Sequence, residues 1–184
     1  VTSIGECAFI DCSTLENITL PFIGERLSET SNTHFGYVFG ASSYSENENY
    51  VPMSLKTVTI TGGSSIGYSA FRDCSKLTRV VIPNSVTTLC TYAFCYASNL
   101  ESVTIPDSIT SLDDFVFDNK YDLILYYKGT QAQWDELLAN NSETSEYLKN
   151  YTVICADNTT YPSGICGDNL IWLFNAETNT LTIS

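Results

Sequence analysis

Basic residues are scarce in this chain of 184 residues. Only 8 Lys and Arg accompany 21 Asp and Glu, which gives a formal net charge of -13, and there is a single histidine. A surface with so few cations repels phosphate backbones and anionic lipid headgroups, and it cannot displace counterions from DNA or RNA. The composition therefore argues against nucleic acid as a partner and against direct binding to a membrane surface.

Long apolar runs are also missing. No run of about 18 apolar residues occurs, and the first residues have neither the charged nor the apolar region of a secretion signal. We therefore expect no direct membrane insertion by this segment, and we expect any signal or anchor to lie outside it. With 43% hydrophobic and 16% charged residues, the composition is nevertheless typical of a folded globular chain.

Motifs for catalysis and metal binding are lacking too. The seven cysteines include no C-x-x-C pair, so no structural zinc site is expected. A catalytic triad or a Cys-His pair would need His34, for which we favour a packing or surface role because no nucleophile elbow or oxyanion-type glycine pattern accompanies it. Asp113, Asp114 and Asp118 lack the spacing of a calcium loop and are interpreted as a solvated acidic patch. The sequence thus predicts no enzyme activity, no metal and no cofactor.

What the sequence does contain is an internal repeat of 23 residues. Phe71, Phe94 and Phe117 recur at this interval, and each copy carries the pattern L-x-x-V-x-I, mostly followed by a proline that ends the strand ladder. The residues expected to point inward from these strands are Leu15, Ile18, Leu20, Leu55, Val58, Ile60, Leu77, Val80, Ile82, Leu100, Val103 and Ile105. A second apolar stretch at 86–89 and 109–112 should form the opposite wall. Such a period predicts a solenoid of stacked coils, stabilised mainly by contacts between neighbours.

The period is interrupted once. Leu15 and Leu55 are 40 residues apart, 17 more than the period, so residues 22–54 should form one coil with an insertion of roughly 17 residues. The aromatic residues of this coil are Phe22, Phe35, Tyr37, Phe39, Tyr44 and Tyr50. We favour packing of these rings on the flank of the solenoid, with contact to a ligand as the alternative.

The residues after the last full copy predict a different organisation. Thr130 and Gln133 match the capping box of a helix that begins just after Thr130. We therefore predict three parts: a repeat array over 1–128, a helical cap over 129–150 and the start of a following β module over 151–184.

Two pairs of cysteines are positioned such that a disulfide has to be considered. Cys12 and Cys74 share one repeat phase but are two coils apart, which separates their backbones by about 10 Å, beyond the reach of a disulfide. We expect both to be small buried hydrophobic residues. Cys155 and Cys166 are the one pair that we regard as a candidate disulfide.

The repeat resembles the BspA-like, treponemal-type class of leucine-rich repeats found in surface proteins of anaerobic gut bacteria. The residues that carry the resemblance are Ile82 to Thr87 in I-P-N-S-V-T, Ile66-Gly67, Ala70-Phe71, Cys74 and Leu77. The resemblance implies a leucine-rich-repeat solenoid, β-rich with short helical corners. It also implies a secreted or cell-surface protein that takes part in adhesion, with a host or bacterial surface protein or glycan as its partner.

Outward strand positions provide the candidate binding site. Stacked coils should align these positions in columns that are short, β-branched or polar, and largely uncharged, which suits contact with a protein or glycan. Exposed aromatic residues of the insertion would add hot-spot contacts beside them. The predicted binding residues are Arg79, Val81, Ser102, Thr104, Phe35 and Tyr37. A non-enzymatic recognition module is the favoured function, and a structural spacer in a larger wall-attached protein is the alternative.

Overall fold

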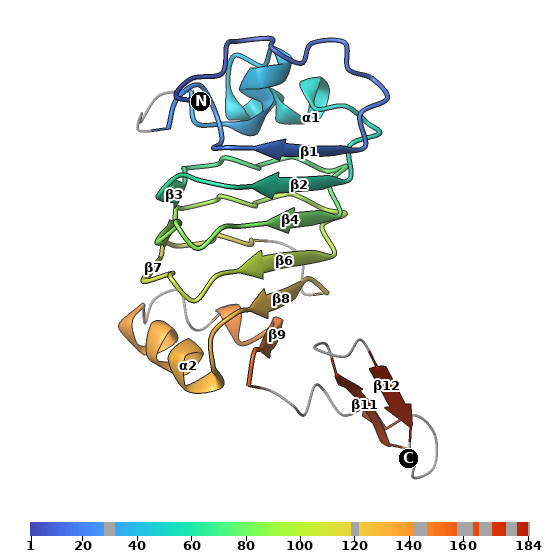
Figure 1. Ribbon diagram of the computed structural model, residues 1–184, viewed down its shortest axis with the longest axis vertical. Coiled ribbons are helices and arrows are strands. Elements are labelled where there is room, and N and C mark those ends of the chain that lie inside the picture. The colour runs from blue at the N-terminus through green and yellow to red at the C-terminus, as the bar shows by residue number, and fades with distance from the viewer. Residues whose placement is uncertain are drawn as a thin grey trace.

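A sheet of six short parallel strands forms the front wall of a solenoid (Figure 1). The computed structural model describes residues 1–27, 32–118, 122–141 and 147–157, and the backbone of three later strands. The six strands, in spatial order, are β1 (Asn17–Leu20), β2 (Thr57–Ile60), β4 (Arg79–Val81), β6 (Ser102–Ile105), β8 (Ile124–Tyr127) and β9 (Thr152–Cys155). The predicted solenoid of stacked coils is confirmed.

A second parallel sheet forms the opposite wall. Its strands are β3 (Ser65–Ile66), β5 (Thr88–Leu89) and β7 (Ser111–Leu112), paired in that order. The inward side chains of these strands are at most 3% exposed, so the wall predicted at 86–89 and 109–112 is present.

The hydrophobic core lies between the two walls and consists of the predicted inward positions. Val58, Val80 and Val103 are fully buried and lie in register on adjacent strands. Burial at roughly 25 cal/mol per Å² makes these inter-coil contacts the main source of stability. Leu15 and Phe9 of the first coil are only partly buried and pack against this core.

The corners between the walls are tight turns around a column of rings. Phe71 stacks on Phe94 with ring centroids 5.2 Å apart, and Phe94 stacks on Phe117 at 5.3 Å. The left-handed backbone conformation, with φ between 51° and 60°, recurs at corner residues Cys7, Asp11, Ser69, Asp73, Tyr92, Tyr96 and Phe115. This conformation is unfavourable by about 1–2 kcal/mol per residue for side chains other than glycine, and ring stacking together with inter-coil hydrogen bonds offsets it.

The described part of residues 22–54, between β1 and β2, contains three short helical segments. These are η1 (Phe35–Phe39), η2 (Tyr44–Glu46) and α1 (Asn47–Tyr50). The fully buried Asn47 amide ties them together: its Oδ1 accepts from the Gly36 N–H at 2.8 Å, and its Nδ2 donates to the Ala70 and Arg72 carbonyls at 3.3 and 2.8 Å. One polar side chain therefore joins this elaborated coil to the next corner.

The predicted division of the C-terminal region is wrong in one respect. Helix α2 (Gln131–Asn140) begins with the predicted capping box, in which the Thr130 hydroxyl accepts from the Gln133 N–H at 3.2 Å. However, α2 connects β8 to β9, and β9 pairs in parallel with β8. Residues 152–155 therefore belong to the sheet of the array and not to a following β module, and α2 comes before the last strand of that sheet rather than after it. The prediction failed because β9 lacks the L-x-x-V-x-I pattern by which the earlier strands were identified.

Three later strands form a separate antiparallel sheet. They are β10 (Gly164–Ile165), β11 (Ile171–Asn175) and β12 (Thr180–Ile183). β11 pairs with both of the others.

Candidate binding face

The outward side chains of the six-stranded sheet align in two columns, and this surface is termed the strand face. The first column contains Asn17, Thr57, Arg79, Ser102, Ile124 and Thr152. The second contains Thr19, Thr59, Val81, Thr104, Tyr126 and Ile154, of which Ile154 is buried at 8% exposure. The alignment follows from the two-residue period of a strand, because the residues between these positions are fixed in the core. Arg79 lies opposite Ser102 and Val81 lies opposite Thr104, as the repeat predicts.

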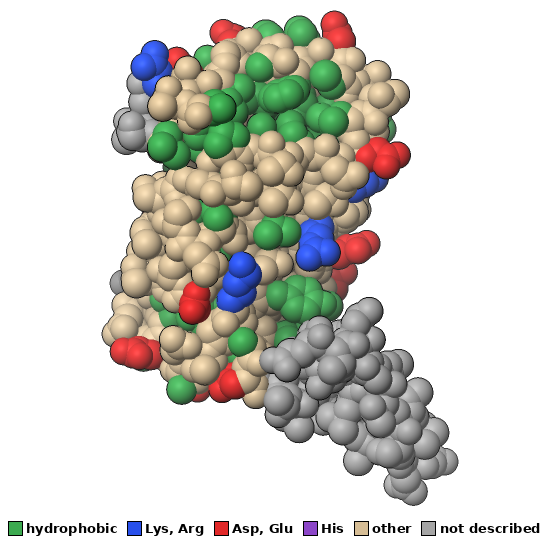
Figure 2. Space-filling view, in the orientation of Figure 1, with side chains coloured by type: hydrophobic (Ala, Val, Ile, Leu, Met, Phe, Trp, Pro, Cys, Tyr) green, Lys and Arg blue, Asp and Glu red, His purple; other side chains and the backbone are tan. Residues whose placement is uncertain are grey.

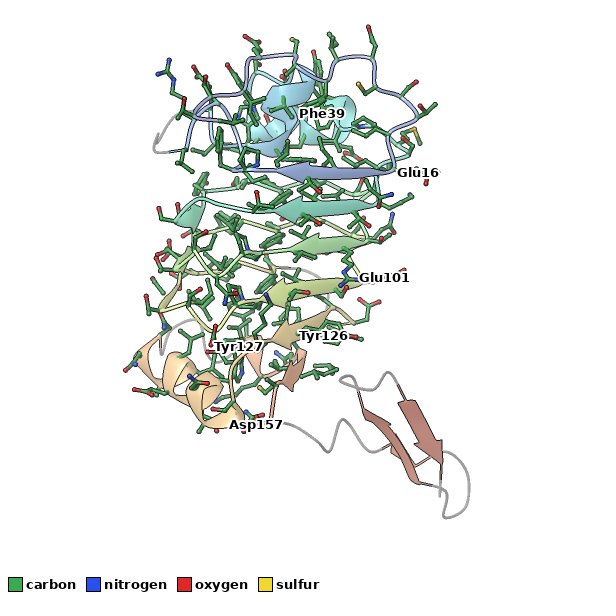
Figure 3. The ribbon with its side chains drawn as sticks, viewed as in Figure 1. Glu16, Phe39, Glu101, Tyr126, Tyr127 and Asp157 are labelled. Carbon is green, nitrogen blue, oxygen red and sulfur yellow. The ribbon has the colours of Figure 1, made fainter. Side chains whose placement is uncertain are left out.

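The strand face carries little charge. Among its twelve positions Arg79 is the one charged residue, although the chain has a net charge of -13. Figure 2 shows this side of the molecule, on which most of the surface over β2 to β8 is neither acidic nor basic. Glu16 and Glu101 lie just before β1 and β6, at the N-terminal ends of these parallel strands (Figure 3). A partner that docks on this face therefore displaces water from few charged groups.

Two apolar residues of the strand face were missed in the sequence. Ile124 and Tyr126 lie opposite Ser102 and Thr104, and both are partly exposed. Figure 3 labels Tyr126. Here the sequence L-I-L-Y-Y departs from the pattern L-x-x-V-x-I, which broke the repeat pattern. Because all five residues of L-I-L-Y-Y are apolar, no apolar/polar alternation marks the outward ones, but counting every second residue from Leu123 would have identified them.

Phe35 and Tyr37 do not reach the surface, which corrects their prediction as binding residues. Phe35 is fully buried, with its ring centroid 5.1 Å from Phe71 and 5.4 Å from Phe39. Tyr37 is 9% exposed, and its ring makes an edge contact with the His34 ring, with the two ring centroids 6.1 Å apart. Segment η1 is inserted between the first corner and the corner at Phe71, so its rings continue the aromatic column of the core. The favoured interpretation, in which the insertion rings pack on the solenoid, holds for both residues.

A line of aromatic rings runs along the outside of the corners. It consists of Tyr44, Tyr68, Tyr92, Phe115 and Tyr147, with successive ring centroids 5.6 to 6.0 Å apart. Tyr68 and Phe115 are 47% and 46% exposed. Tyr68 meets its two neighbours edge-on, whereas Phe115 stacks on both Tyr92 and Tyr147. Stacking at Phe115 reduces the ring face that is open to a sugar.

The buried cysteines are held as thiols. Burial raises the pKa of Cys95 and of Cys155 to about 11, and it raises the pKa of the fully buried Cys74 well above its ordinary value. A thiol in this protonation state is a poor nucleophile and a poor metal ligand at neutral pH. Cys166 lies outside the described residues, so its pairing with Cys155 stays a prediction.

The structure also shows the surroundings of His34 and of the three aspartates Asp113, Asp114 and Asp118. His34 is buried, and its Nε2 lies 2.9 Å from the Ala41 carbonyl oxygen. Within the described ranges, which include Asp113, Asp114 and Asp118, no group of three His, Cys, Asp or Glu side chains is arranged to hold a metal. In the same part of the chain, no helix is long and apolar enough to cross a membrane.

One family of known proteins matches the chain. The model of the BspA type leucine-rich repeat region matches residues 1–124 in six copies. A search of curated proteins and a search of solved structures found no match. The matched range contains the four predicted residues of the strand face on β4 and β6.

Proposed function

Because the chain belongs to the BspA type leucine-rich repeat family over residues 1–124, we propose that it is an extracellular or cell-surface module that binds a protein through its strand face. Proteins of this family are generally surface binding proteins and typically non-catalytic. The proposed partner is a protein on a host or bacterial surface, recognised for adhesion.

The observation that carries this proposal is the low charge of the strand face on a strongly acidic chain. Short polar and β-branched side chains make the surface flat, and few charges must be dehydrated when a partner docks. Arg79 supplies one strong hydrogen-bond donor, and Tyr126 supplies an aromatic side chain further along the columns. Arg and Tyr are the residue types that most often dominate the energy of a protein interface.

A protein is preferred to a glycan as the partner. Glycans bind well to open aromatic faces, whereas Tyr92, Phe115 and Tyr147 stack on one another along the corners. Parallel columns of Thr, Ser and Val instead offer the flat, weakly polar contact that a second protein surface can match. A glycan partner is the outcome that the following experiment distinguishes.

The experiment compares one substitution on the two walls of the solenoid. The wild-type protein is first applied to an array of purified secreted and matrix proteins printed beside a glycan array. Thr104→Arg and Thr88→Arg are then compared on any protein that binds, since both threonines are partly exposed strand residues, on β6 and β5 respectively. Loss of binding by about tenfold or more for Thr104→Arg alone supports the strand face.

Equal effects of the two substitutions contradict the strand face, and binding to glycans alone contradicts the protein partner. The second candidate function is a structural spacer, which the similarity of the short side chains in the strand-face columns favours. Lack of binding on both arrays by the folded protein would favour the spacer.

A further inference from the structure

A groove of about 760 Å³ opens at the N-terminal end of the solenoid. The first corner, residues 9–13, forms one side of it, and residues 48–53 of the elaborated coil form the other. Phe39 and Lys76 complete the lining. Hydrophobic side chains gather at this end of the molecule above β1 (Figure 2), in the region where Figure 3 labels Phe39. The volume lies in the range of sites that bind a small ligand or a few side chains.

The lining of the groove is largely apolar. Phe9 and Phe39 contact each other with ring centroids 6.1 Å apart. Ile10, Tyr50 and Met53 are 53%, 45% and 73% exposed. Single exposed hydrophobic residues are ordinary, but three around one groove form a patch of the kind that marks interaction sites. Because Met is flexible and polarisable, the groove can adapt to an aliphatic or aromatic side chain.

The charges around the groove favour a basic partner. Asp11 and Glu48 line it, and Lys76 is its one basic lining residue. The chain as a whole has a net charge of -13, which attracts cations over a longer range. An apolar side chain flanked by Lys or Arg therefore matches both the lining and the surrounding charge.

A shallow depression connects the groove with the strand face. This depression is lined by Cys12, Thr14, Leu15, Glu16 and Asn17, and it shares Cys12 with the groove. Asn17 is the first residue of one strand-face column. An extended segment lying on the strand face can therefore reach the groove along a continuous surface, past the carboxylate of Glu16.

From these observations we propose that the groove receives an apolar side chain from an extended Lys- or Arg-rich segment of the partner protein. The choice of a protein partner rests on the proposed function. The groove then acts as the anchor point of the interface, and the strand face supplies its broad, weakly polar contact.

The groove contains its own spectroscopic probe, because Met53 is the one methionine of the sequence. Protein labelled with ¹³C in the methionine methyl group, and freed of any initiator methionine, is titrated with the peptide acetyl-Lys-Lys-Phe-Lys-Lys-amide. We expect the Met53 methyl signal to shift with saturation. Two control peptides, with Ala in place of Phe or with Glu in place of Lys, should bind at least about tenfold more weakly.

A matched pair of variants ties the signal to the groove. Ile10→Ser should weaken binding of the Phe peptide about tenfold, and Leu27→Ser should leave it unchanged, since Leu27 is similarly exposed at 47% but lies outside the groove. Circular dichroism checks that both variants are folded. The proposal would be overturned if the Met53 methyl signal responded equally to the Phe and Ala peptides or did not shift at all. It would also be overturned if the glycan chitotetraose shifted this signal more than the Phe peptide did.

Failure of this proposal and failure of the proposed function give different results with a protein captured on the array. If Thr104→Arg abolishes its binding and Ile10→Ser has no effect, the strand-face function stands and the groove proposal is overturned. If Ile10→Ser abolishes binding and Thr104→Arg has no effect, the groove proposal is supported and the strand face is not the binding surface.

Discussion

The regular coils of residues 55–118 and the elaborated coil of residues 22–54 reach a buried core by different means. In the regular coils one contact recurs, as in the stacking of Phe94 on Phe71 and on Phe117. In the elaborated coil Phe35 continues the ring column onto Phe71, and the buried amide of Asn47 adds a unique contact between η1 and the next corner. The repeated contact distributes stability over many neighbours, whereas the unique contact concentrates it in one side chain.

The same two regions also present different surfaces. The regular coils align short outward residues in the flat strand face. The elaborated coil, together with the first corner, leaves a groove with exposed Tyr50 and Met53. Regular stacking therefore produces a periodic surface, and the interruption of the period produces a concave one. The predictions that follow separate these contributions.

The largest effect is expected in the repeated contact. Phe94→Ala should lower the free energy of unfolding by about 3–5 kcal/mol, because it removes a ring that is stacked on both sides and 2% exposed. Urea denaturation measures the loss, and Thr104→Ala, at an outward position of β6, is the control. Similar denaturation midpoints for the two variants would contradict the coil register.

The second-largest loss of stability is expected when the hydrogen bonds of Asn47 are removed. Asn47→Ala should lower the free energy of unfolding by about 2–3 kcal/mol, since the Gly36 N–H and the Arg72 carbonyl lose the partner that Asn47 provides. Asn49→Ala, at an exposed position of the same helix, should change it by less than about 0.5 kcal/mol. Equal urea midpoints for the two variants would show that Asn47 does not anchor the elaborated coil.

A smaller effect is expected from backbone conformation at the corners of the regular coils. Tyr96 has a φ of 58°, so Tyr96→Gly should be more stable than Tyr96→Ala by about 1 kcal/mol, because both variants lose the same ring and only Gly favours this conformation. Thermal unfolding compares them. In α2 the order should reverse, with Ala132→Gly less stable than the wild type by about 1 kcal/mol. The same order at both sites would contradict the corner geometry.

The smallest effect is expected on removal of metal ions. Chelator should leave the melting temperature within about two degrees, because apolar stacking supplies the core of both kinds of coil. Differential scanning calorimetry with and without chelator is the measurement. A decrease of more than about ten degrees would show that Asp113, Asp114 and Asp118, or the cysteines, hold a stabilising ion.

Much of the fold could be predicted because the repeat is local. Leu77, Val80 and Ile82 recur with a constant spacing, and a strand that buries alternate residues has one register with its neighbours. The helix start at Thr130 was equally predictable, because a capping box involves residues only three positions apart. Strand β9 was not, since its pairing with β8 depends on backbone hydrogen bonds and not on the repeat pattern.

The candidate sites divide in the same way. The columns that contain Arg79, Val81, Ser102 and Thr104 follow directly from the period of the sequence, and so they were predicted by residue. The burial of Phe35 depends on the insertion of η1 between two corners, and the groove depends on residues 9–13 meeting residues 48–53. The sequence by itself therefore determined the coil, its register and its outward columns. Only the tertiary structure decided which aromatic residues are buried and where the surface is concave, because packing between distant, non-repeating segments leaves no periodic pattern in the chain.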